Sequence, residues 1–392
     1  MEIEYIERDI RERFNKISKT YKIIALVGAR QAGKTTFLKN KIKQSNAEYV
    51  FFDDPDAIEL FEQDIKKFES QYLNKEITIL DEVQNCKAAG KKLKYLADSG
   101  YKLWITSSSE IILSKEILSH LVGRVSILKL YPFSITEFLR ARNQKQTTKK
   151  LLQREIYNHC LYGGYPKIVL TNDIETKKII NEDLYQTMVL KDIANTFSID
   201  DIESLKRFVK YLSHNIGGQI SYEKISSNLN LSFQTIKKYL QAMEKSYLIY
   251  NVTPFYQNKI KEISKQPKIY FIDTGLRNHI AKQYPSSLTG ELFENYIFSE
   301  LLKSGHEPKY WRTKNKSEVA FIIETNNSLI PIEVKLKAQQ PRKSLRNFIR
   351  TYNPKKAIIV NYEGINKKIK QDKCQIIYAD VLNLLQHIRE EA

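Results

Sequence analysis

The chain has 392 residues and combines 63 Lys and Arg with 45 Asp and Glu, and the resulting net charge of +18 favours a polyanionic partner such as nucleic acid. Its length indicates two or three domains, and it contains no apolar run of about 18 residues that could cross a membrane. A charged N-terminus and three cysteines without metal-ligand spacing argue against a secreted or zinc-dependent protein, so we expect a cytoplasmic one without a membrane partner.

The segment 23–40, IIALVGARQAGKTTFLKN, runs from an apolar strand through a glycine-rich turn into a helix-forming stretch. This is the spacing of a phosphate-binding P-loop, in which glycines let backbone N–H groups surround phosphate oxygens at a helix N-terminus. We expect Lys34 to reach the β and γ phosphates of ATP and Thr35 to hold Mg²⁺ through its hydroxyl. The predicted nucleotide-binding residues here are Gly28, Ala29, Arg30, Gln31, Ala32, Gly33, Lys34, Thr35 and Thr36.

Two further apolar strands end in polar side chains. The segment 76–84, EITILDEVQ, presents Asp81 and Glu82 at the end of a strand. Beside a P-loop, Asp81 suits the outer Mg²⁺ contact and Glu82 suits the base that orients and polarises the attacking water. Taken alone, the two acids would be read as solvated. The segment 102–109, KLWITSSS, is a third apolar strand that ends in hydroxyl groups.

With LVGRVSILKLYPFSITEF at 121–138 and LYGGYP at 161–166, these motifs resemble the archaeal-type AAA+ ATPases of archaea and bacteria, which carry a C-terminal restriction-endonuclease-like domain. The resemblance covers nearly the whole chain and implies an oligomer such as a ring. It also implies that the third strand positions the lytic water, with Thr106, Ser107 and Ser108 as candidates and Ser107 as the one assigned to catalysis.

The same resemblance suggests roles for two more residues. Arg124 is similar to the family's arginine that senses the γ phosphate or acts as a finger toward a neighbouring subunit, but an ordinary surface arginine fits the sequence equally well. Pro166 lies in a motif similar to the Gly-x-Pro element that related signalling ATPases place against the nucleotide. Physically, that motif could also be only a turn before a helix.

Residues 200–255 are typical of a winged helix-turn-helix. A helix from Ser232 has a good N-cap and buries apolar side chains at helical spacing. Four polar residues then face outward, where they could contact a major groove or phosphates of DNA. The alternative is a protein-docking module. The candidate DNA-binding residues are Gln234, Thr235, Lys237 and Lys238.

From Pro267 onward, a helix with Glu294 is followed by the strands KSEVAFIIE and LIPIEVKLK. Strand alternation places Glu333 and Lys335 on one face. This order resembles the PD-(D/E)XK nuclease core, which implies that Glu294 and Glu333 hold Mg²⁺ while Lys335 steadies the attacking water. A plain surface ion pair between Glu333 and Lys335 is the alternative.

The first of these strands departs from the family pattern, because Ala320 stands where the family has an aspartate. Loss of a carboxylate that binds Mg²⁺ should strongly reduce cleavage of nucleic acid. Three explanations stay open: a degenerate domain that binds DNA, an introduced knockout, or replacement by Glu318 or Glu324. Rescue by Glu318 requires a shift of about 6 to 7 Å along the strand.

We therefore predict an α/β fold with a P-loop AAA+ core, a helical lid, a winged helix-turn-helix and a C-terminal α/β nuclease-like domain. The expected function is ATP hydrolysis coupled to remodelling of, or translocation on, duplex or branched DNA, with ATP and Mg²⁺ as cofactors. A nucleotide-dependent signalling or defence switch and an ATP-gated DNA nuclease are the alternatives, and lysine-rich composition can also reflect an AT-rich genome. The predicted boundaries are 1–140 for the ATPase core, 141–199 for the lid or linker, 200–262 for the winged helix and 263–392 for the nuclease-like domain.

Overall fold

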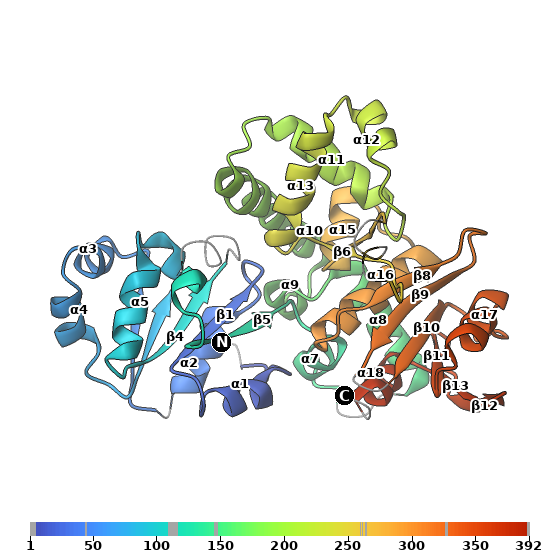
Figure 1. Ribbon diagram of the computed structural model, residues 1–392, viewed down its shortest axis with the longest axis horizontal. Helices are drawn as coiled ribbons and strands as arrows, with labels where there is room; N and C mark the ends of the chain where they lie inside the picture. The colour runs from blue at the N-terminus through green and yellow to red at the C-terminus, as the bar shows by residue number, and fades with distance from the viewer. Residues whose placement is uncertain are drawn as a thin grey trace.

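The computed structural model describes residues 5–43, 45–108, 117–144, 148–258, 260, 262, 265–325 and 328–389. Figure 1 shows two sheet-containing units at opposite ends of the molecule, with a group of helices above and between them. The α/β class expected from the sequence is confirmed, because both units combine parallel strands with helices. No helix in these described ranges has the length and apolar character needed to cross a bilayer.

The N-terminal unit is built on a parallel five-stranded sheet with the order β2-β3-β4-β1-β5. The interior strand β1 is buried along its whole length, as expected when helices cover both faces of a parallel sheet. Its strands are β1 (Ile23–Gly28), β2 (Ala47–Phe51), β3 (Ile77–Asp81), β4 (Lys102–Ser107) and β5 (Val125–Leu130). Its helices are α1 (Arg11–Ile17), α2 (Lys34–Ile42), α3 (Pro55–Gln63), α4 (Ile65–Tyr72), α5 (Ala89–Asp98) and α7 (Ile135–Ala141), with short 3-10 turns η1 (Val83–Asn85) and η3 (Leu118–His120).

The middle of the chain is mostly helical. Polar N-caps begin several of these helices, including Ser232, whose hydroxyl accepts a hydrogen bond from the Thr235 N–H at 3.1 Å. The elements are α8 (Lys149–Tyr162), α9 (Pro166–Leu170), α10 (Ile174–Thr187), the π-helix η4 (Met188–Asn195), α11 (Ile202–His214), α12 (Tyr222–Leu229), α13 (Phe233–Lys245) and α15 (Thr274–Ala281). An antiparallel pair of strands, β6 (Ile249–Val252) and β7 (Lys268–Phe271), completes it.

The C-terminal unit contains a mixed six-stranded sheet with the order β12-β13-β11-β10-β9-β8. The strands β9 and β10 are antiparallel neighbours, and their last paired residues are Phe321 and Ile332. The strands are β8 (Lys309–Arg312), β9 (Glu318–Glu324), β10 (Leu329–Lys335), β11 (Lys356–Asn361), β12 (Lys367–Gln371) and β13 (Cys374–Ala379). Its helices are α16 (Gly290–Lys303), α17 (Lys343–Tyr352) and α18 (Val381–Arg389).

The structure differs from the boundary predicted at residue 263. We expected Pro267 to open the nuclease-like unit, but β7 pairs with β6 in a separate two-stranded sheet. The following helix α15 packs on α8 and α11 rather than on the six-stranded sheet. Local sequence could not reveal this, because an apolar strand such as KIYF fits either sheet.

Helix α16 joins the two sheet-containing units. Near its C-terminal end, Glu300 accepts a hydrogen bond from the Ile135 N–H at 2.8 Å, and Lys303 donates to the Phe133 carbonyl at 3.0 Å. Glu300 and Lys303 also pair with each other at 3.0 Å, and both side chains are almost fully buried. Within the helical middle of the chain, a further buried contact runs from the Gly164 N–H to the Asp273 carboxylate at 2.7 Å. The Glu300 and Lys303 contacts therefore fasten the segment after β5 to the C-terminal unit inside an apolar core.

We predict that Glu300→Ala lowers the free energy of unfolding by about 3–5 kcal/mol, because it leaves the buried Lys303 ammonium without its carboxylate. Chemical denaturation followed by circular dichroism would measure this. The matched control is Glu291→Ala on the exposed start of the same helix, with an expected cost below about 1 kcal/mol. Equal losses for the two variants would contradict a stabilising role for this joint.

Candidate nucleotide-binding site

The P-loop follows β1 and requires glycine at two positions. At Gly28, φ is +150°, and an added Cβ would lie 2.0 Å from the Leu130 carbonyl oxygen of the neighbouring strand. At Gly33, φ is +97°, in the left-handed region that glycine adopts at low cost. The turn between them leads directly into α2, so the N–H groups at the start of that helix point into the loop.

Lys34 is buried inside this loop. Its ammonium donates hydrogen bonds to the carbonyls of Gly28 at 3.0 Å and Ala29 at 3.1 Å. Burial lowers the pKa of the Lys34 ammonium, and the negative charge of Glu82 opposes this shift. A phosphate group at the loop would supply a compensating negative charge next to this cation.

Asp81 lies at the end of β3, directly opposite the start of α2. Its carboxylate accepts hydrogen bonds from the Thr35 hydroxyl at 2.8 Å, the Tyr49 hydroxyl at 2.6 Å and the Thr106 hydroxyl. Burial and the contact with Asp81 raise the pKa of Tyr49, so this hydroxyl remains a donor. A hydroxyl and a carboxylate within hydrogen-bonding distance form a set of hard oxygen ligands, which fits Mg²⁺.

Glu82 follows Asp81 in a left-handed conformation with φ of +60°. Its N–H donates to the Thr106 hydroxyl at 2.9 Å, while its carboxylate accepts from the Ser108 hydroxyl at 3.2 Å and from Gln84. The end of β4 therefore reaches both acids through Thr106 and Ser108. Ser107, the residue assigned to catalysis from the sequence, alternates to the other face of the strand. Ser109 lies outside the described residues.

The structure does not bring Arg124 to the P-loop of its own chain. Arg124 precedes β5 and pairs with Asp98 at 2.6 Å. The register of β1 and β5 places Val125 beside Ile23, whereas Gly28 lies beside Leu130. Six residue steps along the strand, or about 20 Å, thus separate Arg124 from Leu130 beside the loop. A sensor role within one chain does not fit this geometry, and a finger toward another subunit stays a prediction.

Two side chains from distant segments lie against the P-loop. An added methyl group at Gly33 would be 3.9 Å from the Pro166 ring, so the GGYP motif lies beside the loop, and its role as a Gly-x-Pro element stays a prediction. Arg8 is buried and donates to the Ala32 carbonyl at 2.7 Å and to Glu137 at 2.9 Å. Sequence reasoning missed Arg8, Tyr49 and Asp192, which contacts Arg30, because none belongs to a local motif.

The predicted DNA-binding residues lie on the first turns of α13. Gln234, Lys237 and Lys238 are exposed, and Thr235 is partly exposed with its hydroxyl 2.8 Å from that of Ser232. The Lys238 ammonium donates to the Ser198 carbonyl at 2.8 Å, so one of its three N–H donors is used within the chain. Three helices followed by two antiparallel strands are compatible with a winged helix, which stays a prediction.

The nuclease-like residues form two separate ion pairs. The Lys335 ammonium lies 2.9 Å from a Glu333 carboxylate oxygen, and both side chains are buried. Glu294 instead accepts a hydrogen bond from the Tyr270 hydroxyl at 2.6 Å and lies 3.5 Å from the Lys268 ammonium. Within the described ranges, no three acidic, His or Cys side chains are placed to hold a metal ion.

Neither acid considered as a replacement at Ala320 joins Glu333. Glu318 pairs with Lys268, and Glu324 pairs with Lys309. Continuing the β9–β10 register by one residue places Ala320 across from Glu333. An acid at position 320 would thus lie beside Glu333, whereas the acids at 318 and 324 are held elsewhere. The residues present do not fit a nuclease metal site.

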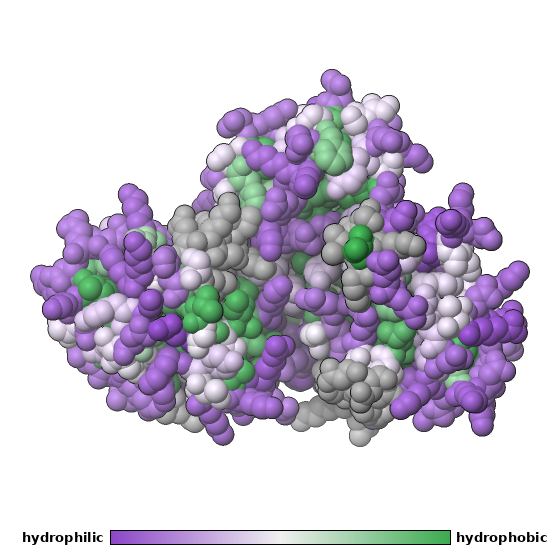
Figure 2. Space-filling model, viewed as in Figure 1, coloured by the Kyte–Doolittle hydropathy of each residue, from purple (hydrophilic) through white to green (hydrophobic). Residues whose placement is uncertain are grey.

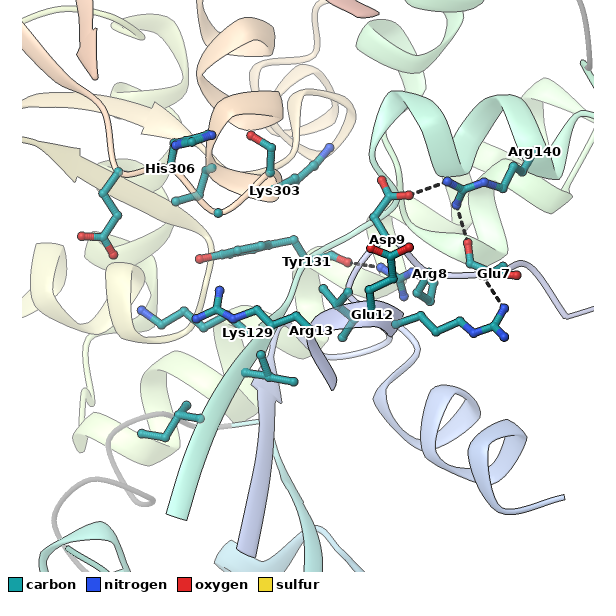
Figure 3. A pocket seen from close by; sticks show the side chains of 18 residues that line it. Glu7, Arg8, Asp9, Glu12, Arg13, Lys129, Tyr131, Arg140, Lys303 and His306 are labelled. Atoms are coloured by element: carbon teal, nitrogen blue, oxygen red, sulfur yellow. Dashed lines mark hydrogen bonds and ion pairs between the residues drawn. The ribbon is translucent and has the colours of Figure 1, made fainter. Parts of the chain in front are cut away.

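One pocket lies away from the P-loop. It has a volume of about 840 Å³ and lies between the N-terminal segment, the end of β5 and the end of α16. Figure 3 shows that Arg8 and Arg140 lie at one side of this pocket, while Lys303 and His306 lie at another. Arg140 pairs with Asp9 there at 2.5 Å. Most of its charges are paired within the chain, so we assign no ligand to it.

Comparison with known proteins places three family models along the chain. An AAA domain matches residues 20–139, and two domains of unknown function (DUF8612 and DUF4143) match residues 153–287 and 289–381. The first match supports an AAA+ ATPase core, for which nucleotide binding and ATPase activity are typical.

Two relatives match along nearly their whole length. An uncharacterized protein of Methanocaldococcus jannaschii is 29% identical over 95% of this chain and 89% of its own. An uncharacterized protein of Haemophilus influenzae is 26% identical over 91% of this chain and 92% of its own. Among solved structures, a Walker-type ATPase of Pyrococcus abyssi is similar, with 15% identity, a TM-score of 0.42, and coverage of 70% of this chain and 96% of that one.

We predict that Ala320→Asp creates a divalent-metal site, because it adds a carboxylate beside Glu333. Titration calorimetry with Mn²⁺, in a Lys34→Ala background that disables the P-loop, should detect binding that the parent lacks. Cleavage of duplex DNA with Mn²⁺ would be the second measurement. Ala320→Asn, of similar size but uncharged, is the matched control. If the aspartate variant gains neither metal binding nor cleavage, the relation to PD-(D/E)XK nucleases loses its main support.

Proposed function

We propose that this chain hydrolyses ATP with Mg²⁺ at the P-loop and uses the reaction to engage or remodel DNA. One observation carries the proposal: four side chains with suitable chemistry lie together at the carboxyl ends of the parallel strands. They are Lys34, Thr35, Asp81 and Glu82. Each of these side chains has the chemistry that phosphoryl transfer to water requires at its position.

The proposed roles follow from charge and position. Thr35 and Asp81 would hold Mg²⁺, which neutralises phosphate charge when bound. Lys34 stabilises negative charge on the β and γ phosphates, and Glu82 accepts the proton of the attacking water. Ser108 and Gln84 orient the Glu82 carboxylate through their contacts with it. Thr106 fixes Asp81 and the backbone of Glu82 together.

In an oligomer, Arg124 would act on the nucleotide site of a neighbouring subunit, because it is too far from the P-loop of its own chain. It lies at the amino-terminal ends of the strands, whereas the P-loop lies at their carboxyl ends. This position is suited to an arginine finger that reaches the nucleotide site of a neighbouring subunit in a ring. Removing the charge of such a residue should reduce hydrolysis without preventing nucleotide binding.

A row of arginines on α17 supports a polyanionic partner. Arg346 and Arg350 lie four residues apart on one side of the helix, and both are exposed. Arg342, the N-cap of α17, is also exposed and lies 3.5 Å from Glu333. Between Val334 and Tyr362, the chain has no acidic residue. The outer side of the C-terminal unit, where α17 lies in Figure 1, is largely hydrophilic in Figure 2. Such a row suits contacts with successive phosphates of a nucleic acid backbone.

A nucleotide-dependent switch is the second candidate function. The position of Pro166 beside Gly33 favours it, because the same motif contacts Asp273 in the other half of the chain through Gly164. A change at the phosphates would then be transmitted without a need for fast turnover. An ATP-gated nuclease has less support, because the residues present do not assemble a metal site.

We predict that duplex, single-stranded or branched DNA stimulates steady-state ATP hydrolysis, because a motor couples turnover to its substrate. Glu82→Gln should lower kcat by about 10²–10⁴-fold with little change in nucleotide affinity, as expected for loss of a general base. Lys34→Ala, which removes the P-loop lysine, is the negative control for ATP hydrolysis. A low rate that no form of DNA changes would favour the switch over the motor.

We also predict that Arg346→Ala/Arg350→Ala weakens binding to duplexes of every sequence and reduces the salt dependence of log K by about 2, because two phosphate contacts are lost. Fluorescence anisotropy across a salt series would measure both effects. The control is Lys66→Ala/Lys67→Ala, which removes the same charge from exposed positions on α4. A slope that changes equally in the two double variants would show that only net charge matters.

A further inference from the structure

Arg30, the third residue of the P-loop, forms an ion pair with a residue far along the chain. Its guanidinium donates to Asp192 in a two-pronged arrangement, with N–O distances of 2.8 Å and 3.0 Å to one carboxylate oxygen and 3.1 Å to the other. The Asp192 side chain is only 7% exposed, and the Arg30 side chain is 32% exposed. Two-pronged arginine–carboxylate contacts are among the stronger and more directional polar contacts in proteins.

Asp192 lies in the π-helix η4, which continues α10. Such segments are rare and are frequently found at functional sites. The backbone of Asp192 is tied to α13, because its carbonyl accepts a hydrogen bond from the Ser246 hydroxyl at 2.7 Å. At the start of η4, the Met188 sulfur accepts from the hydroxyl of Tyr165, which belongs to the GGYP motif, at 3.7 Å. One short segment thus contacts the P-loop, the GGYP motif and the end of α13.

The pair lies at the P-loop itself, because Arg30 is one of the loop residues proposed to surround the phosphates. Glu82, the proposed base for the attacking water, acts electrostatically on both Arg30 and Asp192, and so does Lys34 on Asp192. Burial raises the pKa of the Asp192 carboxyl, while the contact with Arg30 opposes this shift. Asp192 therefore places a buried carboxylate close to the groups that would surround a third phosphate.

We propose that Arg30 and Asp192 distinguish ATP from ADP, with the γ phosphate competing with Asp192 for the Arg30 guanidinium. This inference rests on the proposed nucleotide site and extends it to residues outside the catalytic set. A terminal phosphate attracts Arg30 and repels the Asp192 carboxylate, so ATP opens the pair. ADP lacks that phosphate and leaves the pair closed.

Opening of the pair would reach α13 through η4. Because Ser246 caps the end of α13 and bonds to Asp192, release of the Asp192 side chain frees the segment that holds this helix. The outward residues at the other end of α13 are those predicted to contact DNA. The state of the nucleotide would therefore set the position of the candidate DNA-binding helix.

The competing explanation is that the pair only stabilises the fold, as many buried ion pairs do. The two explanations predict different nucleotide preferences. A structural pair affects ATP and ADP alike, whereas a pair that competes with the γ phosphate changes their ratio.

The test is equilibrium binding of Mg²⁺-ADP and of a Mg²⁺-bound, non-hydrolysable ATP analogue to the full chain. Asp192→Asn should increase the preference for the triphosphate about tenfold, because it removes the competing charge. Arg30→Gln should reduce that preference by a similar factor, because it removes the cation that the γ phosphate would attract. Equal changes for both nucleotides in either variant would overturn the inference.

Two controls keep the outcomes separate. Glu7→Gln breaks an exposed ion pair with Arg11 and should leave the nucleotide ratio unchanged. Failure of the parent chain to bind either nucleotide would contradict the proposed nucleotide site itself rather than the role of this pair. If Asp192→Asn does not fold, Arg30→Gln tests the same contact from its more exposed side.

Hydrogen exchange provides a readout that does not depend on affinity. The triphosphate analogue should speed amide exchange in residues 188–195 of the parent chain, and ADP should not. Asp192→Asn should show the faster exchange without nucleotide. Exchange in this segment that is the same with either nucleotide would argue against opening of the pair.

Discussion

The parallel register of the five-stranded sheet determines what can take part in the nucleotide site. Because β1, β3 and β4 run in one direction, their carboxyl ends lie on the same side of the sheet, where the P-loop, Asp81 and Thr106 come together. The same register places Arg124 at the amino-terminal end of β5, on the opposite side. The parallel register thus explains why Asp81 and Thr106 lie at the P-loop. It also explains why Arg124 is far from the P-loop of its own chain.

The rest of the molecule is attached to that edge through buried polar contacts. Helix α16 bonds to the backbone at Phe133 and Ile135, and the GGYP motif bonds to Asp273. Such contacts are directional, and buried partners are costly to separate. These contacts hold the segment after β5 and the GGYP motif in fixed positions relative to the C-terminal half.

The C-terminal unit holds its candidate site residues in ion pairs within the chain. Glu333 pairs with Lys335, whereas Glu294 lies beside Lys268 and accepts a hydrogen bond from Tyr270. Each of these acids therefore has a lysine ammonium as its neighbour. The exposed side chains of Arg346 and Arg350 lie on α17 of the same unit.

The sequence by itself determined the α/β class, the P-loop and the two acids after β3, because these features depend on local spacing and on apolar strands that are recognisable alone. Only the tertiary structure decided that β7 pairs with β6 rather than opening the last unit. It also decided which hydroxyls of β4 reach the acids, and that Asp192 lies against Arg30, 162 residues away in sequence. Such contacts depend on how distant segments pack, and no local pattern in the chain encodes them.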